Sequence, residues 1–418
     1  MEPAKQPVDL NLISSTGHHE CLGVPPELTD YIMDMLRDDP QTLKACSLTC
    51  KAMFASARHL IHRTLYLTRQ NNEYLLAEER KKGIVHKQRD QVLRFLSHMG
   101  EQGLLRYTTQ VHIDYHGTFI PEFFRPHLRY SKSLDRVHSL TIHNFEVTRW
   151  ENHHKSYFGN LYPTLTSLSL RSPVGHHREF LRFALQFPNL ESLCVEKLDF
   201  EGVRRHVDTN PIIVTVQPPL SGTLRLDRAI TADVSAQLLE DLAFNLPNGI
   251  RFRSIELQQL PGHQAQHLVN ACGGTLEHFA VKFTEQNLQT QLSSLDLGEA
   301  TVLRRLTFHA KGLEELHCGL FLRALSTIKS PVFREVVIEV EGFFRRPWKY
   351  VLGGDWSQLD RHLDELFSMR EDGQLVFRAH EFVDHQSVKT QAMQLFPRVV
   401  ERGRFRFETY GVTGKYWF

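Results

Sequence analysis

Residues 163–171 read Pro-Thr-Leu-Thr-Ser-Leu-Ser-Leu-Arg, and this short stretch carries the pattern that decides the fold. Leu168 and Leu170 fit the apolar side of a short strand, because alternate side chains face opposite sides. Leu165 stands three residues before Leu168. The same apolar-x-x-apolar-x-apolar pattern returns at Val137/Leu140/Ile142, Leu190/Leu193/Val195, Phe252/Ile255/Leu257, Leu276/Phe279/Val281, Leu303/Leu306/Phe308 and Phe333/Val336/Ile338, with a weaker copy at Leu224/Leu226.

The spacing and the punctuation of these strands indicate a repeat array. Measured between the middle apolar residues, the steps run from 24 to 31 residues, close to the leucine-rich-repeat period of about 20–29. A turn residue stands two positions before the first apolar residue at Pro163, Pro188, Gly274 and Pro331. Helical patterns lie between the strands at Phe180/Phe183/Ala184/Phe187, Val234/Leu238/Leu239/Leu242, Leu268/Val269/Cys272 and Leu316/Leu320/Leu325.

A helix, a turn and a short strand make one solenoid unit, which buries its apolar face only against its neighbours. We therefore predict an α/β fold in which an irregular leucine-rich-repeat solenoid stacks short parallel strands into a curved sheet with the helices outside. A doubly wound α/β domain also alternates strands and helices. The irregular period keeps that alternative open, although no glycine-rich phosphate loop follows any of the strands.

The N-terminal part has a different, all-helical pattern. Leu28, Ile32, Met35 and Leu36 recur at helical spacing and make one apolar face, behind Pro25-Pro26, which suits a helix start. Asp39 followed by Pro40 predicts the N-cap and first position of a second helix. A block of about 40 residues cannot bury a large core alone, so its apolar surface is a candidate interface.

These patterns divide the chain into five parts. We expect a disordered polar tail at 1–22, a helical domain at 23–67 that ends in a short strand, a helical connector at 68–104, the solenoid at 105–342 and a C-terminal repeat or cap at 343–418. In the last part Trp356, Leu359, Leu363, Leu366 and Phe367 mark a helix, and Leu375/Phe377 and Phe405/Phe407 mark closing strands.

Composition limits the class of protein. The 418 residues contain 49 Lys and Arg against 48 Asp and Glu, a net charge of +1, whereas proteins that bind nucleic acid or anionic membranes usually show a basic excess. The six cysteines are scattered along a long chain, which does not resemble a disulfide framework. With no signal-peptide core and no long apolar run, we expect a cytoplasmic or nuclear protein without nucleic-acid or membrane partners.

The helical block resembles an F-box. The resemblance rests on Val24-Pro-Pro-Glu-Leu-Thr-Asp-Tyr-Ile, then Asp39-Pro40, Leu43 and Cys46-Ser-Leu-Thr-Cys50, over about 40 residues. It resembles the version found in fungal F-box proteins with irregular C-terminal leucine-rich repeats, whose late repeats are similar to Asp355-Trp356-x-x-Leu359-Asp360. Val24 and Met53-Phe54 stand where that family usually has leucine and tryptophan.

This resemblance implies a substrate-recognition subunit of an SCF-type cullin-RING ubiquitin ligase. The F-box of such proteins binds the Skp adaptor (S-phase kinase-associated protein), and through it the ligase, while the repeats hold a target protein. A chain of this kind is not an enzyme, because other subunits transfer the ubiquitin. Carried over by position, the adaptor contacts or their direct supports are Pro25, Leu28, Ile32, Leu36, Leu43, Leu48 and Phe54.

Charged residues at outward strand positions are candidates for binding the target. The first repeats are rich in hydroxyl side chains and the later ones in charges of both signs, which packing does not require. The candidate substrate-binding residues are Arg171, Glu196, Glu256, Lys282, Arg305, His309 and Glu339.

Metal and catalytic patterns are weak, and we expect no cofactor, no metal site and no catalytic residue. Cys46-x3-Cys50 is followed too soon by His59-x2-His62 for a zinc finger. His112 and His116 lie on a strand-like pattern, where residues four apart are about 13 Å distant. Two other functions stay open: a repeat scaffold whose helical block packs on its own repeats, and an α/β enzyme with a deep pocket of ionisable groups.

Overall fold

The computed structural model of the 418-residue chain describes residues 25–37, 39–49, 51–67, 98–100, 103–114, 134–144, 162–173, 177–198, 219–229, 238–246, 249–258, 262–282, 295–310, 318–340, 356–370, 372–380 and 385–410. The expected tail at 1–22 and most of the expected connector at 68–104 lie outside these residues.

Three short helices form the N-terminal block: α1 (Pro26–Met35), α2 (Pro40–Cys46) and α3 (Lys51–Ile61). Asp39 caps α2 as predicted, because its carboxylate accepts the backbone N–H groups of Gln41 and Thr42, each at 3.1 Å. Met33, Leu43 and Ala57 form a small core of their own, separate from the main core of the chain.

The strands form a single sheet in which every described pair is parallel and the order follows the chain from the first strand to the last. The strands are β1 (Thr64–Leu67), β2 (Gln110–Asp114), β3 (Ser139–His143), β4 (Ser167–Arg171), β5 (Ser192–Leu198), β6 (Thr223–Ala229), β7 (Ser254–Gln258), β8 (His278–Lys282), β9 (Arg305–Ala310), β10 (Glu335–Val340), β11 (Gln374–His380) and β12 (Phe405–Tyr410). A doubly wound domain reverses its strand order part-way. This sheet does not, so the fold is an α/β solenoid.

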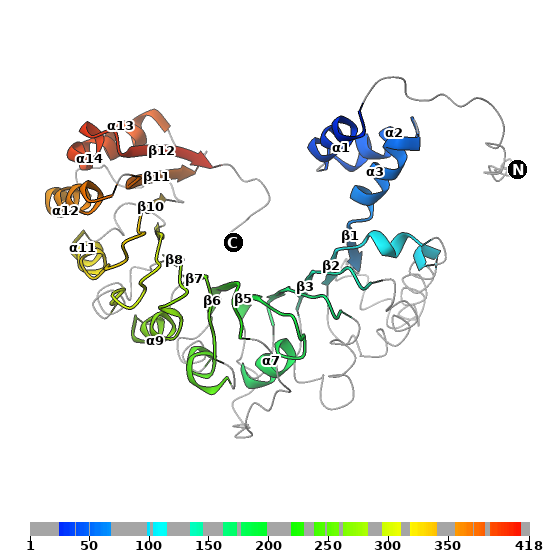
Figure 1. The fold of residues 1–418 in the computed structure, drawn as a ribbon, viewed down its shortest axis with the longest axis horizontal. Helices are drawn as coiled ribbons and strands as arrows, with labels where there is room; N and C mark the ends of the chain where they lie inside the picture. The colour runs from blue at the N-terminus through cyan, green and yellow to red at the C-terminus, as the bar shows by residue number, and fades with distance from the viewer. Residues whose placement is uncertain are drawn as a thin grey trace, which may run out of the picture.

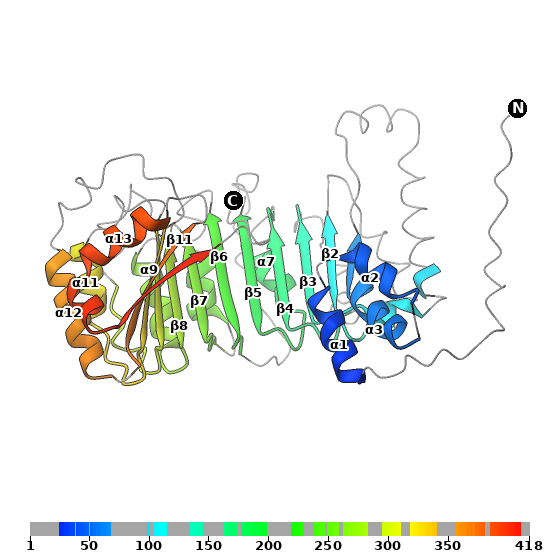
Figure 2. The ribbon, with the colours of Figure 1, turned by 90° about the horizontal axis from the view of Figure 1, so that it is seen from above.

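Figure 1 shows the sheet curving into an arc, with the labelled helices α7, α9, α11 and α12 along its outer side. Figure 2 shows the strands side by side and pointing the same way. The described elements between strands are η2 (Leu104–Tyr107), α7 (His177–Ala184), η7 (Asp241–Asn245), α9 (Gly262–Cys272), α11 (Cys318–Ser326), α12 (Trp356–Ser368), α13 (His385–Leu395) and α14 (Pro397–Glu401).

The repeated apolar pattern builds the core by aligning equivalent residues in successive strands. Leu140, Leu168, Leu193 and Leu224 are register partners in turn across β3 to β6, and all four are buried. Their side chains face the outer helices. The alternate residues therefore face the inside of the arc, and we call that side of the sheet the inner face.

The sheet is longer at both ends than the expected solenoid at 105–342. Residues 64–67 pair in parallel with β2, so the strand that follows α3 opens the sheet instead of closing the helical block. At the other end β11 and β12 continue the same parallel register from β10, so within 343–418, where a repeat or a cap was expected, these two strands continue the repeat. The sheet extends in this way because each added strand buries its apolar side against the preceding strand and its own helix.

Candidate functional site

One side of α1 is apolar and open. Leu28 is 50% exposed, Tyr31 64%, Ile32 41% and Met35 71%. Their spacing of three and four residues puts them on one side of the helix, which we call the α1 apolar face. The opposite side carries Met33 into the small core of the block. Soluble proteins rarely leave so many large apolar side chains together in water without an interaction partner.

The other residues expected to contact the adaptor divide into exposed and buried ones. Pro25 precedes α1 and is exposed, Leu48 follows α2 and is the most exposed large apolar residue described, and Phe54 on α3 is partly exposed. Leu36 is half-buried against the small core. Leu43 is buried inside that core, so it can support the surface but cannot contact a partner.

The sequence predicted Met35 on this face but did not name it as an adaptor contact, and it missed Tyr31. Tyr31 stands three residues after Leu28, and this helical spacing was the signal that could have found it. A shallow groove of about 610 Å³ lies beside Tyr31, between α1, α3 and η2. Asp30 and Asp34 line it, and Asp30 accepts a hydrogen bond from Ser56 at 2.6 Å.

On the inner face, the first half of the sheet carries hydroxyl groups and isolated ion pairs. Ser139, Ser167 and Ser192 are register partners in successive strands. Arg171 pairs with Glu196 of the next strand at 3.0 Å, and Arg225 lies 3.6 Å from Glu256 in the same way. The expected change from hydroxyl-bearing early repeats to charged later ones is confirmed by this register.

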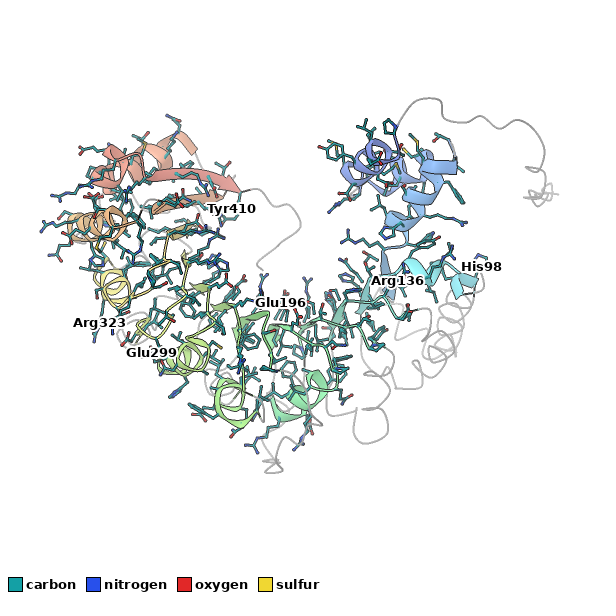
Figure 3. All side chains as sticks on the ribbon, in the orientation of Figure 1. His98, Arg136, Glu196, Glu299, Arg323 and Tyr410 are labelled. Carbon is teal, nitrogen blue, oxygen red and sulfur yellow. The ribbon has the colours of Figure 1, made fainter. Side chains whose placement is uncertain are left out.

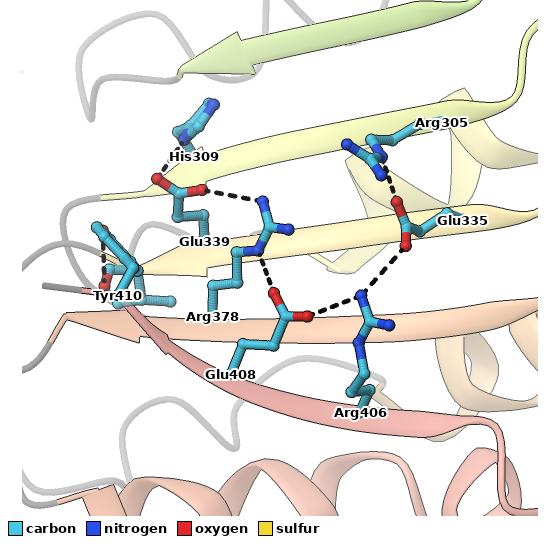
Figure 4. Close-up of polar contacts among 9 residues, drawn as sticks. Arg305, His309, Glu335, Glu339, Arg378, Arg406, Glu408 and Tyr410 are labelled. Atoms are coloured by element: carbon cyan, nitrogen blue, oxygen red, sulfur yellow. Dashed lines mark hydrogen bonds and ion pairs between the residues drawn. The ribbon is translucent and has the colours of Figure 1, made fainter. Parts of the chain in front are cut away.

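The last four strands carry a connected set of ion pairs on the inner face, shown in Figure 4. The set contains no separate clusters of one sign, because each of its three acids contacts two bases. Its contacts are His309–Glu339 at 3.3 Å, Glu339–Arg378 at 3.9 Å, Arg378–Glu408 at 2.7 Å, Glu408–Arg406 at 2.7 Å, Arg406–Glu335 at 3.6 Å and Glu335–Arg305. We call this set the charge ladder.

One part of the charge ladder is buried together with a neighbouring lysine. His309 is 9% exposed and Glu339 7%, and Lys282, the register partner of His309, is 1% exposed. The expectation that these charges are not needed for packing is therefore wrong for these three residues. Val337 lies between Glu335 and Glu339 on the same face and is fully buried too, so this part of the inner face is an interior.

The pKa of Glu339 reflects this environment. Burial alone would raise it, because a buried carboxylate loses solvation. A hydrogen bond from His309 and the charges of Arg378 and Lys282 outweigh burial, so the pKa of Glu339 lies below its ordinary value. Arg171, Glu196, Glu256 and Arg305 stay at least partly exposed and accessible to a partner.

Metal and thiol chemistry have little support among the described residues. No group of three or more His, Cys, Asp or Glu side chains there is arranged to hold a metal ion. Cys50 and His116, which belonged to the two candidate metal patterns, lie outside the described residues. Burial raises the pKa of Cys194 to about 12, which keeps its thiol protonated and unreactive. No described helix has the length and apolar character needed to cross a bilayer.

The chain was compared with protein families and with curated proteins. No protein-family model matches the chain, and a search of curated proteins finds no significant match.

Proposed function

We propose that this chain is the substrate-recognition subunit of an SCF-type cullin-RING ubiquitin ligase. In this proposal the helical block is an F-box that binds the Skp adaptor, and the solenoid, as an irregular leucine-rich-repeat domain, binds a target protein. The chain itself carries no catalytic step, because ubiquitin transfer belongs to the RING module and the conjugating enzyme.

The observation that carries the proposal is the open α1 apolar face. Two of its four residues, Leu28 and Ile32, lie where the F-box resemblance implies adaptor contacts, and helical spacing also places them on one apolar face. A scaffold whose helical block packs on its own repeats would bury this face. Instead the block has its own small core and leaves the face exposed. Fully burying an exposed Leu or Ile side chain contributes about 1.5–3 kcal/mol. Leu28 and Ile32 are about half exposed, so each can add roughly half of that to an interface.

The test is co-purification of the full chain with the Skp adaptor. We expect the wild type to bind and Leu28→Asp to lose binding, because a carboxylate in the apolar contact would be buried without a partner. The matched control is Met369→Asp, which places the same charge at a residue that is 78% exposed and far from α1 in the chain. It should bind like the wild type.

Circular dichroism of each variant checks that the fold is retained. If the folded wild type fails to bind the adaptor, or if Leu28→Asp binds as well as Met369→Asp, the proposal is wrong. In that case an interaction scaffold becomes the better description of the chain.

A further inference from the structure

Arginine side chains gather where strands β7 to β10 begin. Arg253, Arg304 and Arg334 each directly precede a strand, and Arg305 is the first residue of β9. The backbone connects them in one line, because Glu277 donates to the Arg253 carbonyl, Arg304 to that of Glu277 and Arg334 to that of Arg304, at 2.8 to 3.0 Å. We call Arg253, Arg304, Arg305 and Arg334 the arginine rim.

Carboxylates neutralise only part of the arginine rim. Arg304 lies 3.6 Å from Glu277, and Arg305 pairs with Glu335 (Figure 4). Glu335 is buried beneath the surface, while the side chain of Arg305 remains 39% exposed. Arg253 and Arg334 are exposed and form no ion pair with any side chain in the described part of the chain. Two members of the arginine rim, Arg304 and Arg305, thus pair with a carboxylate, and Glu335 is shared with Arg406, in a protein whose net charge is only +1.

His278 lies among these groups, at the start of β8 and in register with Arg305. Its Nδ1 atom is buried and has no hydrogen-bond partner within the described residues. Burial and the charges of Arg305, Arg304 and Arg334 hold the pKa of His278 below its ordinary value, against the opposite influence of Glu277. An anion bound here would counter the positive charge that these arginines create.

We propose that the arginine rim binds an anionic segment of a protein, one rich in carboxylates or carrying phosphate groups. The planar fork of a guanidinium matches both kinds of oxygen anion. A nucleic acid fits less well, because it needs a longer, uniformly basic surface, and Glu277 and Glu335 interrupt this one. Describing the segment as part of a ubiquitylation target rests on the proposed function, whereas binding itself does not.

The test is fluorescence anisotropy with the full chain and no adaptor present. The probes are fluorescein-labelled oligoglutamate, a peptide of alternating glutamate and phosphoserine, oligolysine and oligodeoxythymidylate. We expect one or both anionic peptides to bind, more weakly as salt is added, and oligolysine not to bind. Comparing the two anionic peptides identifies whether carboxylate or phosphate is preferred.

Variants assign the binding to the arginine rim. Arg253→Gln or Arg334→Gln should raise the dissociation constant about two- to fivefold, as for other exposed ion pairs. The triple variant with Arg304→Gln should raise it about tenfold or more. Arg136→Gln is the matched control, because Arg136 is exposed on the loop before β3, at the other end of the arc (Figure 3). It should leave binding unchanged.

Two outcomes would overturn the inference. One is that neither anionic peptide binds, or that the triple variant binds them like the wild type. The other is that oligodeoxythymidylate alone binds and loses affinity in the triple variant, which would identify a nucleic-acid site. Leu28→Asp should not alter this assay, so failure here and failure of adaptor binding can be told apart.

Discussion

Gly273 lies between α9 and β8, where the chain passes close to the next repeat. A Cβ atom at this position would lie 2.5 Å from the carbonyl oxygen of Glu299 and 2.9 Å from its carbonyl carbon, so the backbone would have to move. We expect Gly273→Ala to lower the free energy of unfolding by about 1–3 kcal/mol, as overpacked sites do. Urea denaturation measures this change in the free energy of unfolding.

The neighbouring Gly274 is the matched control, because a Cβ there would meet no atom within 4 Å. Gly274→Ala should be neutral or stabilising by up to about 1 kcal/mol, since alanine restricts the unfolded chain. Equal effects of the two substitutions would show that the repeats are not packed as closely as described.

Glu339 gives the charge ladder a pH dependence with a definite sign. Its pKa is lower in the folded chain than its ordinary value of 4.5, so its stabilising contribution is complete above that value. The contribution is lost as the pH falls through the folded-state pKa. We expect Glu339→Gln to destabilise the chain by about 1–3 kcal/mol at neutral pH, and the difference from wild type to shrink below pH 4.5.

Urea unfolding at neutral and acidic pH measures this difference. Glu408→Gln is the control at the outer end of the charge ladder, where the side chain is 31% exposed, and it should cost less. A Glu339→Gln penalty that stays constant over the pH range would contradict the assigned pKa direction.

At the scale of elements, Asp360 of α12 connects two helices of the last repeats. Its carboxylate accepts the backbone N–H of Arg398 at 3.0 Å and of Val399 at 3.2 Å, in the first turn of α14. These N–H groups have no partner within a helix, so a side chain must satisfy them. Asp360→Ala should lower the thermal midpoint and cost about 0.5–2 kcal/mol, while the exposed Asp372→Ala should change little. If Asp360→Ala and Asp372→Ala lower the thermal midpoint by similar amounts, Asp360 does not cap α14.

Element prediction succeeded where local pattern and burial agree. The repeat at 165, 168 and 170 predicted a strand because each apolar residue packs inward. In the weak copy at Leu224/Leu226 the first apolar residue is Leu220, four residues before Leu224, whereas the other copies have it three residues before the middle one. Leu220 forms a parallel bridge with Ile250. For the last two strands a repeat and a cap both stayed open, because the sequence does not indicate whether a strand joins an existing sheet.

At the scale of the whole molecule, the candidate sites were only partly predictable. Helical spacing identified Leu28 and Ile32 as surface residues without the structure. Alternation along a strand also assigned Lys282 and Glu339 to the inner face. It could not predict their burial, because that depends on the long side chains of neighbouring strands. Of the arginine rim, only Arg305 was a predicted binding residue, because Arg253 and Arg334 become neighbours of the other two only through strand pairing.

The central claim is that the α1 apolar face binds the Skp adaptor while the solenoid remains available. Hydrogen–deuterium exchange of the full chain, with and without the adaptor, tests it most directly. We predict slower exchange on binding in residues 26–35 and 47–54 and no change in β3 to β12. Unchanged exchange in α1 under conditions where the two proteins co-purify, or protection confined to the strands, would contradict the account.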